Sequence, residues 1–324
     1  MSPPTVTLAR PIAIATPATR ALYLQNWDRL RVIAALDTVA HHLTGAHALF
    51  GFGLPLFLML SVALSVARPG PPPTRRFVTR RIDRVVWPWL FWAAVLTALR
   101  TYFAVTTGHE PFGWVEWPMV LYGPRIHLWF LPFVVVAGVL AHLIHLRSQG
   151  RHALLSAGIA LVIGVALLPL PPRVLLVWPF DQWLFSVPSI ALGYALGRAV
   201  STERSLPRLR LLLTSGYAAF ALLAGAVVLL FADTGPYVLR YVGGLGLLVV
   251  ATWLPNTGDR ITKRIAPLML GVYMLHPGVY SIILKPILLE IGLEHLMWLR
   301  LVTGFFATMG LVALLRWTKI KRFL

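Results

Sequence analysis

One predicted helix carries a carboxylate and two adjacent imidazoles in an otherwise apolar stretch. Asp37, His41 and His42 lie within the apolar segment at about 30–48, and Asp37 and His41 are four positions apart, so they share a helical face. A carboxylate on that face could hold an imidazole in one tautomer and stabilise its charged form. Ionisable groups inside apolar spans are rare and usually functional. The pattern favours acid–base chemistry, with helix-packing histidines as the alternative.

Metal binding is a further interpretation of the histidines in this segment. The candidate ligands are His41, His42 and His47. Adjacent histidines project about 100° apart on a helix, which is poor ligand geometry, and no second carboxylate is evident. The chain also has no Cys that could supply a thiolate ligand. We therefore expect no metal site.

Arginines at the start of the same helix and before a later one could form an anion site. Arg31 and His42 are eleven positions apart, which is about 16 Å at ~1.5 Å per residue. This separation suits a long substrate with an anionic head and a reactive tail. Arg81 and Arg84 are three apart and precede an apolar segment at 85–106. Arginine forks suit phosphate recognition, although a charged flank that only sets membrane topology is the alternative.

Aromatic and imidazole groups in two other segments are candidates for lining a cavity. Trp129 lies at the start of the apolar segment at 127–146, where an interfacial anchor is the alternative. Tyr273 and His276 are three apart and share a helical face, and Pro277 follows at once. A proline kink frees backbone groups and often marks a cavity in a membrane helix, whereas ordinary helix packing is the alternative.

The elements that must position these residues are membrane-spanning helices. Hydrophobic residues make up 58% of the 324 residues and charged residues only 12%, about half the share in a soluble domain, which excludes a soluble globular enzyme. We expect an all-α, polytopic transmembrane bundle of about ten helices, because apolar runs near the ~20-residue membrane length recur. The predicted spans are 30–48, 49–67, 85–106, 127–146, 153–170, 183–200, 209–231, 237–254, 267–289 and 296–317.

The charge distribution sets the orientation of these helices. Lys and Arg number 29 against 11 Asp and Glu, a net charge of +18, and most of the basic residues fall in alternate loops and at both termini. By the positive-inside rule both termini are cytoplasmic. The excess charge therefore needs no nucleic acid to explain it. The basic residues outside this cytoplasmic set are Arg100, Arg125, Arg173, Arg240, Lys285 and Arg300.

Four motifs in this order resemble the membrane-bound acyltransferase-3 family of multi-pass sugar and glycan O-acetyltransferases. The first is Arg31, ten residues and His42, and the second is Arg81-x-x-Arg84 followed by a Trp-Pro pair at 87–88. The third is His-Leu-Trp-Phe-Leu at 127–131 and the fourth is Tyr-Met-Leu-His-Pro at 273–277. The likeness spans residues 22–317. The chain departs from the family pattern with Arg29 in place of a small residue and Asp37 in place of an apolar one.

The resemblance implies an enzyme with an acyl-CoA donor, most simply acetyl-CoA. Its phosphates would bind Arg31, Arg81 and Arg84. Catalysis would use His42 as general base or as acyl carrier, with Asp37 and His41 beside it. The implied acceptor is a hydroxyl of a carbohydrate or lipid-linked glycan, with Trp129, Tyr273 and His276 in the cavity wall. Whether the imidazole of His41 or that of His42 acts in catalysis stays open.

The composition and the charge pattern, together with the extent of the resemblance, predict a domain layout and a location. We expect a disordered cytoplasmic tail at 1–21, a transmembrane acyltransferase domain at 22–317 and a basic cytoplasmic C-terminus at 318–324, embedded in the lipid bilayer of the cytoplasmic (inner) membrane. The residues alone leave a proton-coupled secondary transporter as an alternative, with Asp37, His41 and His42 as a proton relay. An inactive relative that acts as a partner in glycan assembly is a third possibility.

Overall fold

The computed structural model of the protein describes residues 17–44, 51–67, 71–113, 115–124, 126–150, 152–170, 174, 176–203, 205–255 and 259–324, with side chains from residue 26. The helices in these ranges are α1 (Pro17–Thr44), α2 (Gly53–Val66), α3 (Thr74–Arg81), η1 (Ile82–Val86), α4 (Trp87–Thr106), α5 (Met119–Tyr122), η2 (Ile126–Trp129), α6 (Phe130–Arg147), α7 (His152–Ala166), α8 (Phe180–Thr202), α9 (Leu206–Leu230), η3 (Ala232–Thr234), α10 (Gly235–Trp253), α11 (Arg260–Ile265), η4 (Ala266–Leu268), α12 (Met269–Val279), η5 (Tyr280–Leu284), α13 (Lys285–Glu290), α14 (Met297–Leu315) and η6 (Lys319–Phe323). No strand occurs within the described ranges.

The predicted all-α membrane bundle is confirmed. Within the described ranges, seven continuous helical segments are long and apolar enough to cross a membrane, and α2 and α7 are shorter apolar helices. Together with α1, which is less apolar because it carries the charged residues discussed above, these segments coincide with the predicted spans. On α9, apolar side chains such as Leu222 and Leu229 are exposed, as expected of a helix that faces lipid.

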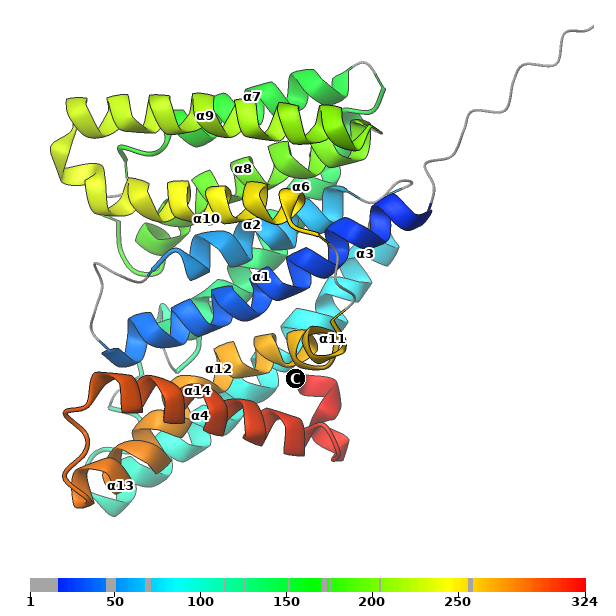
Figure 1. The fold of residues 1–324 in the computed structure, drawn as a ribbon. Helices are drawn as coiled ribbons and strands as arrows, with labels where there is room; N and C mark the ends of the chain where they lie inside the picture. Colours follow the sequence, from blue (N-terminus) through cyan, green and yellow to red (C-terminus); the bar gives the residue numbers. More distant parts are fainter. Residues whose placement is uncertain are drawn as a thin grey trace, which may run out of the picture.

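Helix α1 lies at the centre of the bundle. It contacts α2 and α10 on one side and α12 and α14 on the other, and it crosses between these two groups in Figure 1. Leu30 and Ala34 belong to a buried apolar cluster with α8, α9 and α10, whereas Ala35 and Val39 belong to a second cluster with α4, α6, α12 and α14. Small side chains on α1 let its neighbours approach closely. A residue on α1 can therefore meet side chains from either group.

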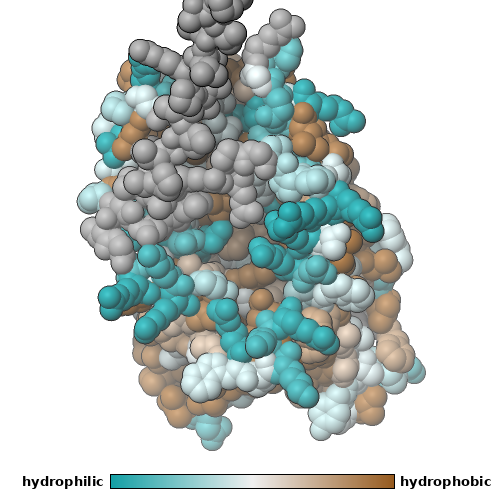
Figure 2. All heavy atoms as spheres, turned by 90° about the vertical axis from the view of Figure 1, so that its right-hand side faces the viewer, coloured by the Kyte–Doolittle hydropathy of each residue, from teal (hydrophilic) through white to brown (hydrophobic). Residues whose placement is uncertain are grey.

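The start of α1 and the C-terminal η6 lie at the same end of the molecule (Figure 1). Hydrophilic side chains gather on this face in Figure 2, which views that end directly. Exposed arginines of α3 and α11 belong to the loops that the positive-inside rule assigns to the cytoplasm. We call this face the basic end, and the opposite face, where α1 and α12 finish, the outer end.

The predicted N-terminal tail is described only in part, whereas the predicted C-terminal segment is described in full. Residues 1–16 of the predicted tail lie outside the described ranges, and α1 already begins at Pro17. The C-terminal segment packs on α4, because the Trp92 indole donates a hydrogen bond to the Phe323 carbonyl at 2.8 Å. The Phe323 ring also stacks on Phe91 with a centroid distance of 4.3 Å.

Candidate active site

A cavity of about 240 Å³ lies beside the outer half of α1. From the predicted set of site residues, Asp37, His41, His42, Trp129 and Tyr273 line it. These side chains come from α1, η2 and α12, and further walls come from the starts of α8 and α10. Helix packing thus brings together residues that are more than 200 positions apart in the sequence.

Three histidines from three helices lie close together here, and we call them the histidine cluster: His42, His127 and His276. His42 and His127 line the cavity, whereas His276, which was predicted to line it, lies buried behind them. The His276 ring centroid lies 5.3 Å from that of His42 and 5.9 Å from that of His127. His276 is fully buried, whereas His42 is exposed on the cavity wall. The sequence analysis gave no role to His127. The signal that could have indicated one is its place as the first residue of the motif at 127–131.

Pro277 determines which nitrogen of His276 carries a hydrogen. Proline has no backbone N–H, so the Tyr273 carbonyl four residues earlier loses its helical donor. His276 Nδ1 lies 2.9 Å from this carbonyl oxygen and 3.2 Å from that of Val272. Carbonyls only accept, so Nδ1 bears the hydrogen and Nε2 of the neutral ring keeps a lone pair. Nε2 is buried and has no hydrogen-bond partner among the described residues.

Helix α12 also holds His127 in place. His127 Nε2 lies 3.0 Å from the Met274 carbonyl oxygen, and the Tyr273 hydroxyl donates to the His127 carbonyl at 2.8 Å. Tyr273, which was predicted to line the cavity, therefore also fixes the backbone of η2. The motifs at 127–131 and 273–277 interlock through these two hydrogen bonds.

Asp37 fastens the start of α2 to the middle of α1. Its Oδ2 accepts hydrogen bonds from the backbone N–H groups of Gly51 at 2.9 Å and Gly53 at 2.6 Å. The expected partner was the His41 ring, but the described hydrogen bonds of Asp37 go to these two glycines instead. Asp37 Oδ1 is buried and has no partner among the described residues.

Both positions that bind Asp37 require glycine. Gly51 has φ +127°, in the region that L side chains rarely adopt. A Cβ at Gly53 would lie 2.8 Å from Asp37 Oδ2 and 2.9 Å from the Thr38 hydroxyl oxygen. The Gly-x-Gly pattern at 51–53 is thus the feature of the sequence that allows Asp37 to bind this segment.

The cavity also has walls that sequence reasoning missed. Trp178 stands edge-on to Trp129, with ring centroids 6.4 Å apart and planes at 87°. Arg240, five residues into α10, lines the cavity and packs over Gly51, where a Cβ would lie 2.9 Å from the arginine Nε. Nothing in the local sequence around Trp178 or Arg240 connects them to His42, because their approach depends on how α8 and α10 pack.

The predicted arginines have separate surroundings. Arg31 donates to Asp28 on its own helix at 2.6 Å, and Arg81 donates to the Ser65 hydroxyl of α2 at 2.7 Å. Arg84 is exposed on η1. None of the three lines the cavity that His42 lines, within the described part of the chain.

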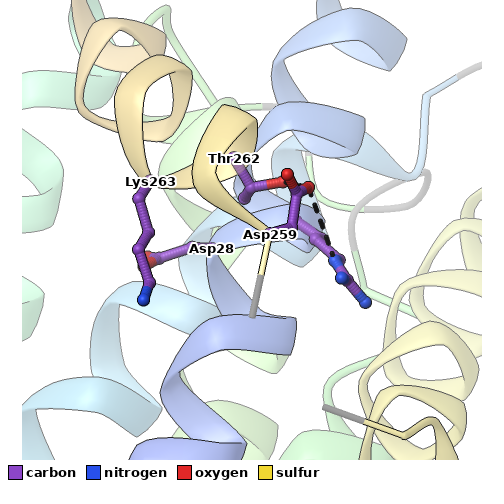
Figure 3. Close-up of a pocket in the computed structure, with 5 residues that line it drawn as sticks. Asp28, Asp259, Thr262 and Lys263 are labelled. Atoms are coloured by element: carbon purple, nitrogen blue, oxygen red, sulfur yellow. Dashed lines mark hydrogen bonds and ion pairs between the residues drawn. The ribbon is translucent and has the colours of Figure 1, made fainter. Parts of the chain in front are cut away.

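A small polar pocket at the basic end joins α1 to α11 (Figure 3). Asp259 begins α11, where its carboxylate accepts hydrogen bonds from the Thr262 hydroxyl and from a backbone N–H, and it lies 4.0 Å from Arg29 Nε. The Thr262 hydroxyl is the main reason that the pKa of Asp259 lies below its ordinary value. At about 10 Å³ the pocket has room for no more than a water, so this cluster holds two helices together.

The His, Asp and Glu side chains of the described residues form no group of three or more that could hold a metal ion. The cavity therefore offers imidazole, carboxylate, guanidinium and indole groups for proton transfer and for hydrogen bonding to a substrate.

Comparison with known proteins identifies the family. A family model described as an acyltransferase domain matches residues 24–317, which is nearly the whole chain. No curated protein and no solved structure matches the chain. The family match and the helical architecture agree with the four motifs and their order. The chain therefore belongs to the acyltransferase-3 family and is a multi-pass membrane acyltransferase.

Proposed function

We propose that the protein transfers an acetyl group from cytoplasmic acetyl-CoA to a hydroxyl of a carbohydrate or lipid-linked glycan at the outer side of the cytoplasmic membrane. The observation that carries this proposal is the position of His42, which faces the cavity with the buried His276 ring 5.3 Å away, centroid to centroid. The family supplies acyl transfer as the reaction class. Acetyl, coenzyme A, the carbohydrate acceptor and the role of His42 are our additions.

The chemistry follows from the lone pair on His276 Nε2. This acceptor has no partner among the described residues, so a small movement of the His42 ring when substrate binds would let it accept one His42 N–H, and the other ring nitrogen would then be basic towards the cavity. As general base, His42 takes the acceptor's hydroxyl proton while that oxygen attacks the thioester carbonyl carbon. The carbon–sulfur bond then breaks, and the CoA sulfur receives the proton from His42. If His42 first carries the acyl group itself, the same nitrogen attacks the carbonyl carbon, the carbon–sulfur bond breaks and the CoA thiolate leaves. The acceptor oxygen then attacks the acyl carbon, the carbon–nitrogen bond breaks, and the freed imidazole takes the hydroxyl proton.

The donor would lie along α1. Arg31 is about 16 Å from His42 along the helix axis at ~1.5 Å per residue. Its pairing with Asp28 is partly exposed, and such pairs are weak, so a phosphate can replace the carboxylate. Arg81 and Arg84 would contribute further phosphate contacts on the same side of the membrane.

The walls of the cavity suit a sugar ring. Trp129 and Trp178 offer apolar faces at right angles, and the Trp178 indole N–H is buried with no hydrogen-bond partner among the described residues. Asp37 Oδ1 is an unused acceptor for a hydroxyl. Apolar faces combined with a few unpaired polar groups are typical of small-molecule sites.

The test is the His42→Ala variant, assayed in membranes with radiolabelled acetyl-CoA and by mass spectrometry of envelope glycans. We expect acetyl transfer to fall by at least about 10²-fold, the usual minimum for loss of a general base, with unchanged protein level in the membrane. His109→Ala changes an exposed histidine outside the cavity and serves as the matched control. Full activity of His42→Ala would refute the assignment. Solute uptake into proteoliposomes without any acyl donor would instead favour a proton-coupled transporter that uses Asp37, His41 and His42.

A further inference from the structure

Arg240 is a basic residue at the outer end, where the charge pattern places few basic residues. It falls outside the set of arginines and lysines that mark the cytoplasmic loops, and it sits five residues into α10, near the outer end. A charged side chain within a membrane helix is costly and usually faces a functional cavity. Arg240 lines the cavity that contains His42.

The guanidinium of Arg240 makes no close ion pair with the described residues. No carboxylate of the described residues lies within 4.0 Å of it. Asp37 shares the cavity, but its Oδ2 is occupied by the N–H groups of Gly51 and Gly53. Arg240 interacts electrostatically with the Asp37 carboxylate across the cavity. Its closer contacts are with uncharged groups: it packs over Gly51, and its Cζ lies 5.7 Å from the centroid of the Tyr237 ring.

A second unpaired donor belongs to the same cavity. The Trp178 indole N–H is buried and has no hydrogen-bond partner among the described residues, and Trp178 lines the cavity together with Arg240. A buried donor without a partner is unfavourable until a ligand supplies an acceptor. An indole N–H and a planar guanidinium fork are both donors only, so together they select an acceptor-rich group such as a carboxylate or phosphate.

We propose that Arg240 binds an anionic group, a carboxylate or a phosphate, on the acceptor molecule, so that the enzyme acylates acidic rather than neutral glycans. This inference rests on the proposed function, because it assumes that the outer cavity takes the acceptor. The donor's phosphates would bind at the opposite end of α1, so they do not compete for Arg240. An acidic group held there would orient the sugar so that a hydroxyl faces His42.

Binding is measured with three glycosides that differ only at carbon 6: methyl β-glucoside, methyl β-glucuronide and methyl β-glucoside 6-phosphate. The full-length protein in detergent is titrated with each, and tryptophan fluorescence reports occupancy, since Trp129 and Trp178 line the cavity. We expect one or both acidic glycosides to bind at least about tenfold more tightly than the neutral one, as for a hydrogen bond to a charged group. Which of the two acidic glycosides binds more tightly shows whether the site prefers a carboxylate or a phosphate.

Two variants assign the preference to Arg240. Arg240→Gln should remove the preference, so that the acidic and the neutral glycosides bind with similar affinity. Arg240→Lys keeps the charge but loses the fork, so it should retain part of the preference. Arg100→Gln is the matched control, because Arg100 is also outside the cytoplasmic set but donates to the Pro124 carbonyl away from the cavity.

The inference is overturned if the wild-type protein binds all three glycosides equally or binds none, a result that needs no variant. It is also overturned if Arg240→Gln weakens all three alike. Acetyl transfer from acetyl-CoA is assayed separately. Selective binding of acidic glycosides without transfer would support the anion site and count against the proposed function, whereas transfer without acidic preference would do the reverse.

Discussion

The outer cavity and the basic end are built in different ways. Around the cavity, three histidines, a carboxylate and aromatic walls converge from four separate parts of the chain, and backbone hydrogen bonds hold several of them. At the basic end, the three predicted arginines each have their own surroundings, and Arg84 is simply exposed. In the function we propose, helix packing would place the reactive group before any substrate arrives, whereas the phosphate contacts would form only when the donor binds.

This difference matches the demands of the two tasks. General base catalysis requires a hydrogen-bonded geometry within a few tenths of an ångström, which rigid elements supply. Binding a flexible chain that carries several phosphates needs charge and several donors, which arginine side chains near the surface can provide. The comparison predicts that changes at the cavity will affect the rate of the chemical step, and changes at the basic end will affect donor affinity.

The largest effect is expected from His276. Replacing it with Leu removes the acceptor beside His42, and we expect kcat to fall by about 10²-fold with little change in the KM for acetyl-CoA. A purely structural role would leave the pH dependence of the remaining activity unaltered. We expect the pH profile of kcat to shift, because the partner of His42 has changed. An unchanged profile together with a small loss of activity would separate His276 from catalysis.

The next effect concerns Asp37 and is mainly on stability. Asp37→Ala leaves the buried Gly53 N–H without an acceptor, which should cost about 1–3 kcal/mol of stability, measured as a lower thermal transition in detergent. Asp37→Asn can still accept both N–H groups through its amide oxygen, so its transition should stay close to that of the wild type. If Asp37→Asn keeps its fold but loses activity, the charge of Asp37 serves the reaction as well as the fold.

At the basic end the expected effects are moderate and confined to donor binding. Arg81→Gln or Arg84→Gln should each raise the KM for acetyl-CoA by roughly tenfold, with kcat nearly unchanged. Arg75→Gln on α3 is a matched control, since Arg75 is exposed and lies outside the Arg81-x-x-Arg84 pattern. An unchanged KM in both variants would remove the phosphate role from this segment.

The smallest effect is expected from Pro277. An Ala at this position restores a backbone N–H that competes with His276 Nδ1 for the Tyr273 carbonyl. The preference of His276 for the tautomer with hydrogen on Nδ1 should weaken. We expect kcat to fall only by a few-fold, because the imidazole itself is still present. Thermal stability should be equal or higher, since proline inside a helix is unfavourable. A large loss of kcat would show that the kink does more than fix a tautomer.

Relations within one helix could be predicted from the sequence. The ten spans, the depth of His42 on α1 and the shared face of Tyr273 and His276 follow from helical periodicity and from the apolar runs. The motifs at 127–131 and 273–277 also supply residues that line the cavity. Each of these features depends on residues close together in the chain.

Relations between helices could not be predicted in this way. The contact of His127 with His276 and the approach of Arg240 depend on how α6, α10 and α12 pack, and apolar helix faces that meet a neighbour look like faces that meet lipid. The partner of Asp37 was expected one turn along its own helix, but it lies in the following segment. The signal for it was the pair of glycines at 51 and 53, whose meaning depends on a contact that no local pattern encodes.

The placement of Arg31 and His42 on one uninterrupted helix limits how the chain can vary in length between them. An inserted residue would rotate everything after it by about 100° and advance it by about 1.5 Å, so His42 would turn away from the His276 ring. Adding a whole turn would restore the face but lengthen the interval by about 5.4 Å. We therefore expect that neither a single-residue nor a one-turn insertion or deletion is tolerated between Arg31 and His42. The segments that join the helices can change length more freely.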